Sequence, residues 1–189
     1  HYFQVGYNEH YYNTKISPNP RAPEIVFMGN NYGNTFPLGG ARKEMVMELK
    51  RRYGKRFGVY GSGWGHEQNL NQAQLIEASI YRGCKIAINF SHFNLKRYSS
   101  DRLFRILGCG AFCLTHRYKE IEKEFTDGED LVCFDSLNHL CELIDKYLPL
   151  AGERNMIAAN GNKKCEAEFT WSARMVQLQQ IIKQMELVC

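Results

Sequence analysis

Short apolar runs alternate with helically spaced patterns from residue 24 onward. The runs are expected to be buried strands and span residues 24–28, 56–60, 85–90, 111–115 and 131–134. The patterns between them predict helices at residues 40–53, 72–82, 101–107, 118–125 and 137–148. Because strands separated by single helices need crossover connections, the order predicts an α/β fold: a doubly wound, mainly parallel, Rossmann-like sheet with helices on both faces.

The predicted helix 40–53 has two contrasting faces. Its apolar stripe consists of Met45, Val46, Leu49 and Tyr53. Its charged stripe consists of Arg42, Lys43, Glu48 and Arg51. The apolar stripe should face the sheet, and Gly54 should end the helix.

A long amphipathic helix is predicted at the C-terminal end. Thr170 is a suitable N-cap residue. The apolar seam that follows consists of Trp171, Met175, Leu178, Ile182 and Met185. We expect this seam to pack on its own domain; the alternative is that it reaches toward a missing neighbour.

Length and composition limit the remaining choices. With 189 residues, 44% hydrophobic and 23% charged, the chain has room for one sizeable domain. Residues 24–189 should form it, and residues 1–23 read as an irregular linker entering it from a missing N-terminal domain. No apolar run is long enough to span a membrane. A net charge of +4, spread along helices, gives no indication of a nucleic-acid partner.

The seven cysteines are scattered, with no close pair, and their number is odd. This usage suits a reducing, cytoplasmic setting better than a disulfide framework. His and Cys do not cluster at ligand spacing, so no metal site is expected.

Ligands of open parallel sheets bind beyond the carboxyl ends of the strands. The first segment expected there contains Gly29, Asn30 and Asn31 and continues into the helix that begins near Gly40. Small residues and a helix N-terminus suit a phosphate, although a simple turn between strand and helix explains them equally well.

The second segment runs from Gly61 to Gly65. Small residues at a strand end allow close backbone approach, as at Gly61. Trp64 could stack on a base or cover the core, and the sequence does not separate these uses.

The third segment contains Ser91 and then Ser99, Ser100 and Arg102. Ser99 or Ser100 is a plausible N-cap, which places Arg102 in the first helical turn, where the helix dipole disfavours a cation. An anion would complete this site; the alternative is pairing of Arg102 with Asp101 or another carboxylate.

The sequence does not indicate a hydrolase site or a metal-dependent site. No Ser lies in a GxSxG elbow, so a hydrolase triad is not indicated. His66 and His92 lie near the expected ligand edge, but each is isolated in the sequence. No carboxylate pair follows a strand in the way that would hold a diphosphate through a metal.

Residues 99–114, SSDRLFRILGCGAFCL, resemble the C-terminal, donor-binding domain of group 1 glycosyltransferases of GT-B architecture, in particular the branch of spore-maturation-type proteins. Residues 120–134 and 169–174 are similar to further stretches of that family, as are residues 5–7 and 27–30. The likeness covers nearly the whole chain.

The resemblance implies a transferase that binds a UDP- or GDP-sugar without a metal or a further cofactor, opposite an N-terminal domain that binds an unknown acceptor. Asn30, Asn31 and Arg42 would face the diphosphate or sugar. Ser99, Ser100 and Arg102 would contact ribose or phosphate, and the loops near Trp64 and Ser91 would contact the base. No catalytic base can be named.

Three positions depart from the family pattern. Arg97 and Arg105 stand where many relatives have Glu residues, the second of which holds the ribose, so Arg105 could bind phosphate instead. Phe169 replaces a common His. A non-catalytic nucleotide-binding or protein-interaction module therefore remains the main alternative. A dehydrogenase-like domain is a weaker one, because the first strand is not followed by GxGxxG.

Overall fold

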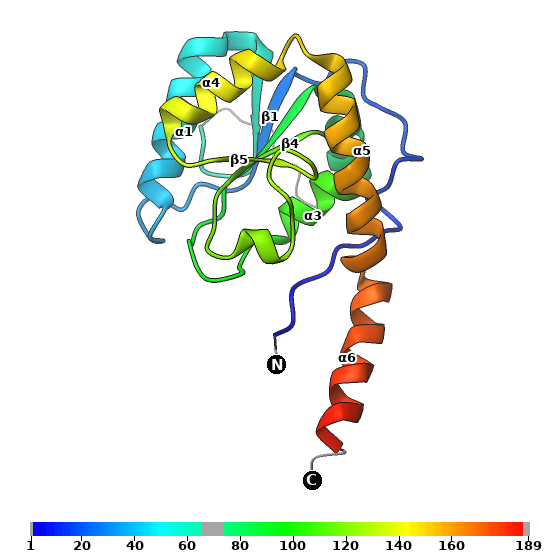
Figure 1. The fold of residues 1–189 in the computed structure, drawn as a ribbon. Coiled ribbons are helices and arrows are strands. Elements are labelled where there is room, and N and C mark those ends of the chain that lie inside the picture. Colours follow the sequence, from blue (N-terminus) through cyan, green and yellow to red (C-terminus); the bar gives the residue numbers. More distant parts are fainter. Residues whose placement is uncertain (1, 66–73, 187–189) are drawn as a thin grey trace.

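The computed structural model describes residues 2–65 and 74–186. Its centre is a five-stranded, wholly parallel sheet with the strand order β2-β1-β3-β4-β5 (Figure 1). The strands are β1 (Ile25–Met28), β2 (Phe57–Tyr60), β3 (Ile86–Asn89), β4 (Cys113–His116) and β5 (Val132–Phe134). The helices are α1 (Gly39–Tyr53), α2 (Gln74–Gly83), α3 (Asp101–Gly108), α4 (Leu137–Tyr147), α5 (Ala151–Glu168) and α6 (Trp171–Glu186), with 3₁₀ turns at Gly54–Arg56 and Ile121–Lys123.

Alternate side chains of the strands enter two separate cores. Val26 and Met28 of β1 join the core under α2, α3 and α5, whereas Ile25 and Phe27 join the core under α1 and α4. Both faces of the sheet are therefore covered, as the near-continuous apolar strands require. The predicted doubly wound, Rossmann-like fold is confirmed.

One predicted helix is wrong. Residues 118–125 form only the 3₁₀ turn Ile121–Lys123, because Glu120 adopts a left-handed conformation (φ 62°) that a right-handed helix cannot contain. Tyr118, Ile121 and Phe125 of this segment are nevertheless buried. The helix predicted at 72–82 begins at Gln74 in the described residues, and its first two positions lie outside them.

Helix α5 has no counterpart among the predicted elements. It carries few large apolar side chains, so its sequence shows little periodicity. It packs closely through a small residue: a Cβ atom on Gly161 would lie 2.1 Å from the backbone carbonyl oxygen of Asp130. The close approach of the α5 backbone to that of Asp130, rather than a large apolar stripe, sets the position of this helix.

Residues 2–23 lie along the domain. Tyr7 and Tyr12 are buried in the core under α3 and α5. The backbone of Tyr7 pairs with the α5–α6 junction, through Tyr7 N to Phe169 O (3.0 Å) and Trp171 N to Tyr7 O (3.0 Å). This segment therefore contributes to the fold of the domain.

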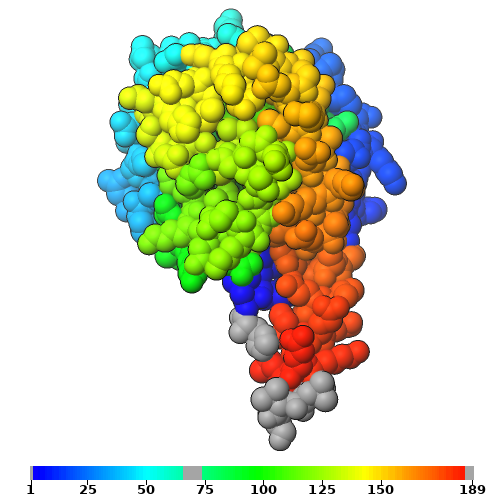
Figure 2. Space-filling view, in the orientation of Figure 1, coloured from blue at the N-terminus to red at the C-terminus, as the bar shows by residue number. Residues whose placement is uncertain are grey.

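Helix α6 begins as predicted, with the Thr170 hydroxyl accepting a hydrogen bond from Ala173 N (3.0 Å). Beyond its first turns it projects away from the rest of the molecule (Figures 1 and 2). The expectation that its apolar seam packs on the domain is wrong, since Trp171, Met175, Ile182 and Met185 are 40–55% exposed.

The six described cysteines are all free thiols, and five of them are buried. Cys189 lies outside the described residues. None of the helices in the described part of the chain is long and apolar enough to cross a membrane.

Candidate functional site

The strand order reverses between β1 and β3, which lie side by side although the chain continues from them to opposite sides of the sheet. At their carboxyl ends begin the β1–α1 loop (residues 29–38) and the β3–α3 loop (residues 90–100). The two loops are joined by a hydrogen bond from Leu38 N to His92 O (3.1 Å). This is the position at which open α/β sheets bind ligands.

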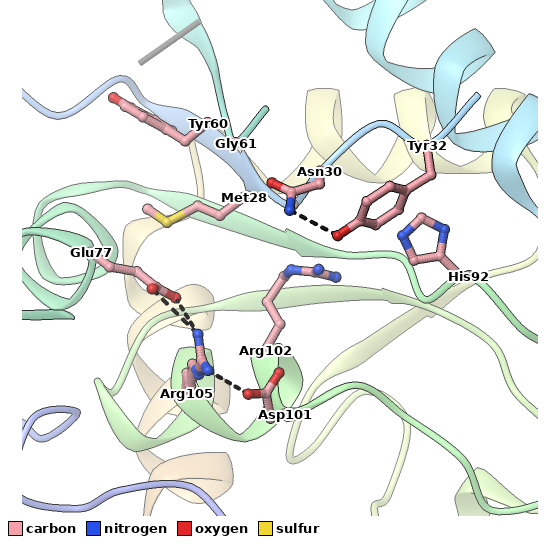
Figure 3. Close-up of a pocket in the computed structure, with 11 residues that line it drawn as sticks. Met28, Asn30, Tyr32, Tyr60, Gly61, Glu77, His92, Asp101, Arg102 and Arg105 are labelled. Carbon is pink, nitrogen blue, oxygen red and sulfur yellow. Dashed lines mark hydrogen bonds and ion pairs between the residues drawn. The ribbon is translucent and has the colours of Figure 1, made fainter. Parts of the chain in front are cut away.

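A cavity of about 310 Å³ opens at this point (Figure 3). Its walls come from β1, β2, α2, α3 and the two loops. The lining residues are Met28, Gly29, Asn30, Tyr32, Tyr60, Gly61, Glu77, His92, Asp101, Arg102 and Arg105.

Two arginines from different helices converge on the backbone at Gly29. A Cβ atom at this position would lie 2.7 Å from Nη2 of Arg102 and 2.9 Å from Nη2 of Arg42. Both guanidinium groups donate to the carbonyl oxygen of Phe90, at 2.5 Å from Arg42 and 3.4 Å from Arg102. A side chain at position 29 would displace both guanidinium groups, so Gly29 leaves the room in which the arginines meet above the sheet edge.

The charges of these two arginines lack a counter-ion within the described residues 2–65 and 74–186, where neither forms an ion pair. Arg42 is only 1% exposed, so this member of the predicted charged stripe of α1 is buried. Burial and the charge of Arg102 lower the pKa of Arg42 to about 9. Buried cations are ordinarily paired, so the arrangement would be stabilised by an anion bound between α1 and α3.

Arg105 is in a different electrostatic situation. It forms ion pairs with Glu77 of α2 (3.4 Å) and with Asp101 one turn earlier on α3. Although burial opposes it, these carboxylates raise the pKa of Arg105. Asp101 therefore pairs with Arg105 and not with Arg102, and the charge of Arg105 is already compensated.

The glycine-rich segments support the cavity through their backbones. A Cβ atom on Gly61, which has a φ of 121°, would lie 2.7 Å from the carbonyl group of Gly29. The side chain of Asn30 accepts from Ser62 N (2.9 Å), and that of Asn31 donates to Gly63 O (2.9 Å). The asparagines thus fasten the β1 and β2 loops together.

Trp64 donates its indole N–H to Gly29 O, 2.6 Å away, and its ring meets Phe27 edge-on with 6.2 Å between centroids. The indole therefore covers the core beside the cavity and is not among the residues that line it.

The predicted serines form a hydrogen-bonded network around Asn89 at the end of β3. Asn89 Nδ2 donates to the hydroxyls of Ser99 (3.1 Å) and Thr115 (2.9 Å), and the Ser100 hydroxyl donates to Asn89 Oδ1 (3.3 Å). Ser91 Oγ accepts from Ser100 N (3.2 Å). Ser99 is 1% exposed, so these groups hold the start of α3, and with it Arg102, in position.

Of the eleven residues predicted from the sequence, five line the cavity: Gly29, Asn30, Gly61, Arg102 and Arg105. Arg42 lies directly behind them, and Asn31, Trp64, Ser91, Ser99 and Ser100 support the loops. Glu77 was not predicted, and no local signal marks it, because only the packing of α2 beside α3 brings it to the site. His66 lies outside the described residues.

His92 should make stability depend on pH. Burial and the charges of Arg42 and Arg102 lower its pKa to about 4, whereas an unfolded chain binds the proton near 6.5. Because the unfolded state then holds more protons, stability should fall as the pH drops from about 6.5 toward 4. Allowing for the partial exposure of His92, we expect a loss of about 1 kcal/mol at pH 5 relative to pH 7.5.

Urea unfolding of the wild type and of His92→Gln at both pH values would measure this difference, since all other residues are common to both proteins. Identical pH profiles would contradict the expected role of the two arginines.

A family model described as glycosyl transferase-like matches residues 42–180, which include Arg42, the cavity walls from β2 to α3 and most of α6. The chain belongs to this glycosyl transferase-like family. No curated protein matches the sequence.

Several solved structures share the fold. Sucrose-phosphate synthase from Thermosynechococcus elongatus is 13% identical with a TM-score of 0.64, over 98% of this chain and 52% of that one. Anabaena HepE in complex with UDP-glucose is 11% identical with a TM-score of 0.66, over 95% of this chain and 56% of that one. The chain thus spans about half the length of these proteins.

A third structure is a single domain that the match covers almost completely. The C-terminal domain of a group 1 family glycosyltransferase, LpcC from Francisella tularensis, is 12% identical with a TM-score of 0.55, over 84% of this chain and 98% of that domain. At such low identities these likenesses show the fold.

Proposed function

We propose that this chain is the donor-binding domain of a glycosyltransferase of GT-B architecture and that its cavity holds a nucleoside-diphosphate sugar. The observation that carries the proposal is the convergence of Arg42 and Arg102, two uncompensated cations, on Gly29 at the point where the strand order reverses. A diphosphate supplies the missing negative charge, and the guanidinium fork can bind its oxygens in pairs.

The charge developing on the leaving nucleoside diphosphate would be stabilised by the same arginines, so that a metal is not needed for this purpose. Glu77 and Asp101 can accept hydrogen bonds from the two ribose hydroxyls, a task for which the sequence pattern offered no carboxylate. Family membership and the fold shared with HepE, which was solved with UDP-glucose, support this assignment.

The finer parts of the proposal follow from the resemblance. We assign the chain to the spore-maturation-type branch and expect an acceptor-binding domain to complete the active site. The free thiols favour a cytoplasmic location. The alternative is a module that keeps the fold without catalysing transfer.

Calorimetric titration of the 189-residue chain with UDP, GDP, ADP and their hexose conjugates, with and without EDTA, tests the proposal. We expect saturable binding of one nucleotide that EDTA does not change. At a hundredfold excess over the Kd, that nucleotide should raise the Tm by about 5–10 °C, since binding then contributes about 2.7 kcal/mol. A folded chain that binds none of these compounds would favour the non-catalytic module.

A further inference from the structure

The cavity has two chemically different ends, with the guanidinium group of Arg102 between them (Figure 3). One end holds Glu77, Asp101 and Arg105, with Met28 beside Glu77. The other end holds Tyr32 and His92, and the Arg102 side chain points toward it. A ligand placed across Arg102 therefore presents different groups to the two ends.

The second end belongs to an aromatic cluster built by the two loops. Tyr32 and Phe36 come from the β1–α1 loop, and His92 and Phe93 come from the β3–α3 loop. Ring centroids lie 5.4 Å apart for Tyr32 and His92, 4.7 Å for Phe36 and His92, and 5.3 Å for Phe36 and Phe93. A hydrogen bond from Asn30 Nδ2 to the Tyr32 hydroxyl (3.0 Å) orients the tyrosine.

Two features of this cluster point to a ligand. Tyr32 is 49% exposed, so a large aromatic face remains uncovered at the cavity. His92 lies beside Tyr32, with its ring tilted at 47° to the tyrosine ring, and it also lines the cavity. An uncovered ring beside an imidazole and a guanidinium group is typical of a site that binds a partly apolar, partly hydroxylated molecule.

We propose that Tyr32 and His92 form the subsite for the glycosyl unit of the donor, a pyranose whose C–H face stacks on the aromatic rings. The negative face of an aromatic ring attracts the weakly positive C–H groups of a sugar. The imidazole of His92 and the guanidinium group of Arg102 can form hydrogen bonds with the hydroxyls of the sugar. This inference rests on the proposed function, which it extends by assigning the orientation of the donor.

The orientation follows from placing the ribose at the carboxylate end, where Glu77 and Asp101 can accept hydrogen bonds from both of its hydroxyls. When the ribose diol lies on Glu77 and Asp101 and the diphosphate on Arg102 and Arg42, the glycosyl unit reaches the Tyr32 end. In the reverse orientation the base would stack on Tyr32. A bare nucleoside diphosphate contains the base but not the glycosyl unit. It would therefore contact Tyr32 only in the reverse orientation.

The test compares two ligands on matched variants. Calorimetry would measure UDP and UDP-glucose, with GDP and GDP-mannose or ADP and ADP-glucose used instead if that base binds. Stacking of the expected strength predicts that Tyr32→Ala weakens the sugar conjugate about 3- to 10-fold and the bare nucleoside diphosphate less than twofold. Tyr32→Phe, which keeps the ring, should retain most of the affinity for the conjugate.

Equal loss for both ligands, or no loss for either, would overturn the glycosyl subsite while leaving donor binding intact. Absence of nucleotide binding by the wild type would overturn the proposed function and this inference together.

If Tyr32→Ala fails to fold, saturation-transfer NMR on the wild type answers the same question. Saturating aromatic protons should then transfer more strongly to the glycosyl protons than to those of the base, and the opposite order would contradict the assignment.

Discussion

Replacing Arg102 by alanine is expected to weaken nucleoside diphosphate binding about 10- to 100-fold. A hydrogen bond from a charged donor contributes about 1.5–3 kcal/mol, and every 1.4 kcal/mol corresponds to a factor of ten. Arg102→Lys keeps the charge but loses the planar fork, so its affinity should lie between those of the wild type and the alanine variant. Calorimetry with the nucleotide that the wild type binds measures both.

The same substitution should not destabilise the unliganded protein. Within the described part of the chain, Arg102 makes only long hydrogen bonds, to Phe90 O (3.4 Å) and Ser100 Oγ (3.3 Å), and its charge opposes that of Arg42. Arg51→Ala is the matched control, because Arg51 is an exposed residue of the last turn of α1 that pairs with Glu48. Unchanged affinity in Arg102→Ala, or a similar loss in Arg51→Ala, would contradict the assigned anion site.

The largest loss of stability is expected for Phe169→Ala. The Phe169 ring packs on both Phe104 and Phe125, with centroid distances of 4.8 and 5.1 Å, and the guanidinium of Arg174 lies 4.3 Å from its centre. Truncating a fully buried phenylalanine costs about 3–5 kcal/mol, which corresponds to a decrease in Tm of about 6–20 °C for a domain of this size. Thermal and urea unfolding would measure it.

Met175→Ala is the control for this prediction, since Met175 is 44% exposed on α6 and its truncation should change stability by less than about 0.5 kcal/mol. Similar losses in both variants would mean that α6 makes a contact that its exposure does not show. The stack also gives a physical reason for Phe169 where relatives carry His: its neighbours are apolar rings, and an imidazole there would lose that packing.

The site residues that could be predicted from the sequence are those marked by a local sequence rule. Arg102 was identified because a cation in the first turn of a helix opposes the helix dipole, which is a local rule. Gly29, Asn30 and Gly61 were identified because small and polar residues follow strands. The burial of Arg42 was not identified, because the charged residues around it in the sequence of α1 are typical of a solvent-exposed helix face.

The sequence by itself determined the alternation of strands and helices, and therefore the parallel sheet, because periodicity and chain connectivity permit few other arrangements. It also determined which strand ends would carry small and polar residues.

Only the tertiary structure decided which charges meet. Glu77 lies beside Arg105 because α2 packs next to α3, and Arg42 reaches Arg102 because Gly29 leaves room between them. The tertiary structure also decided the place of α5, whose contact depends on backbone approach at Gly161, and the exposure of the α6 seam. These outcomes depend on distances between segments far apart in the chain, which a local pattern of residue types does not contain.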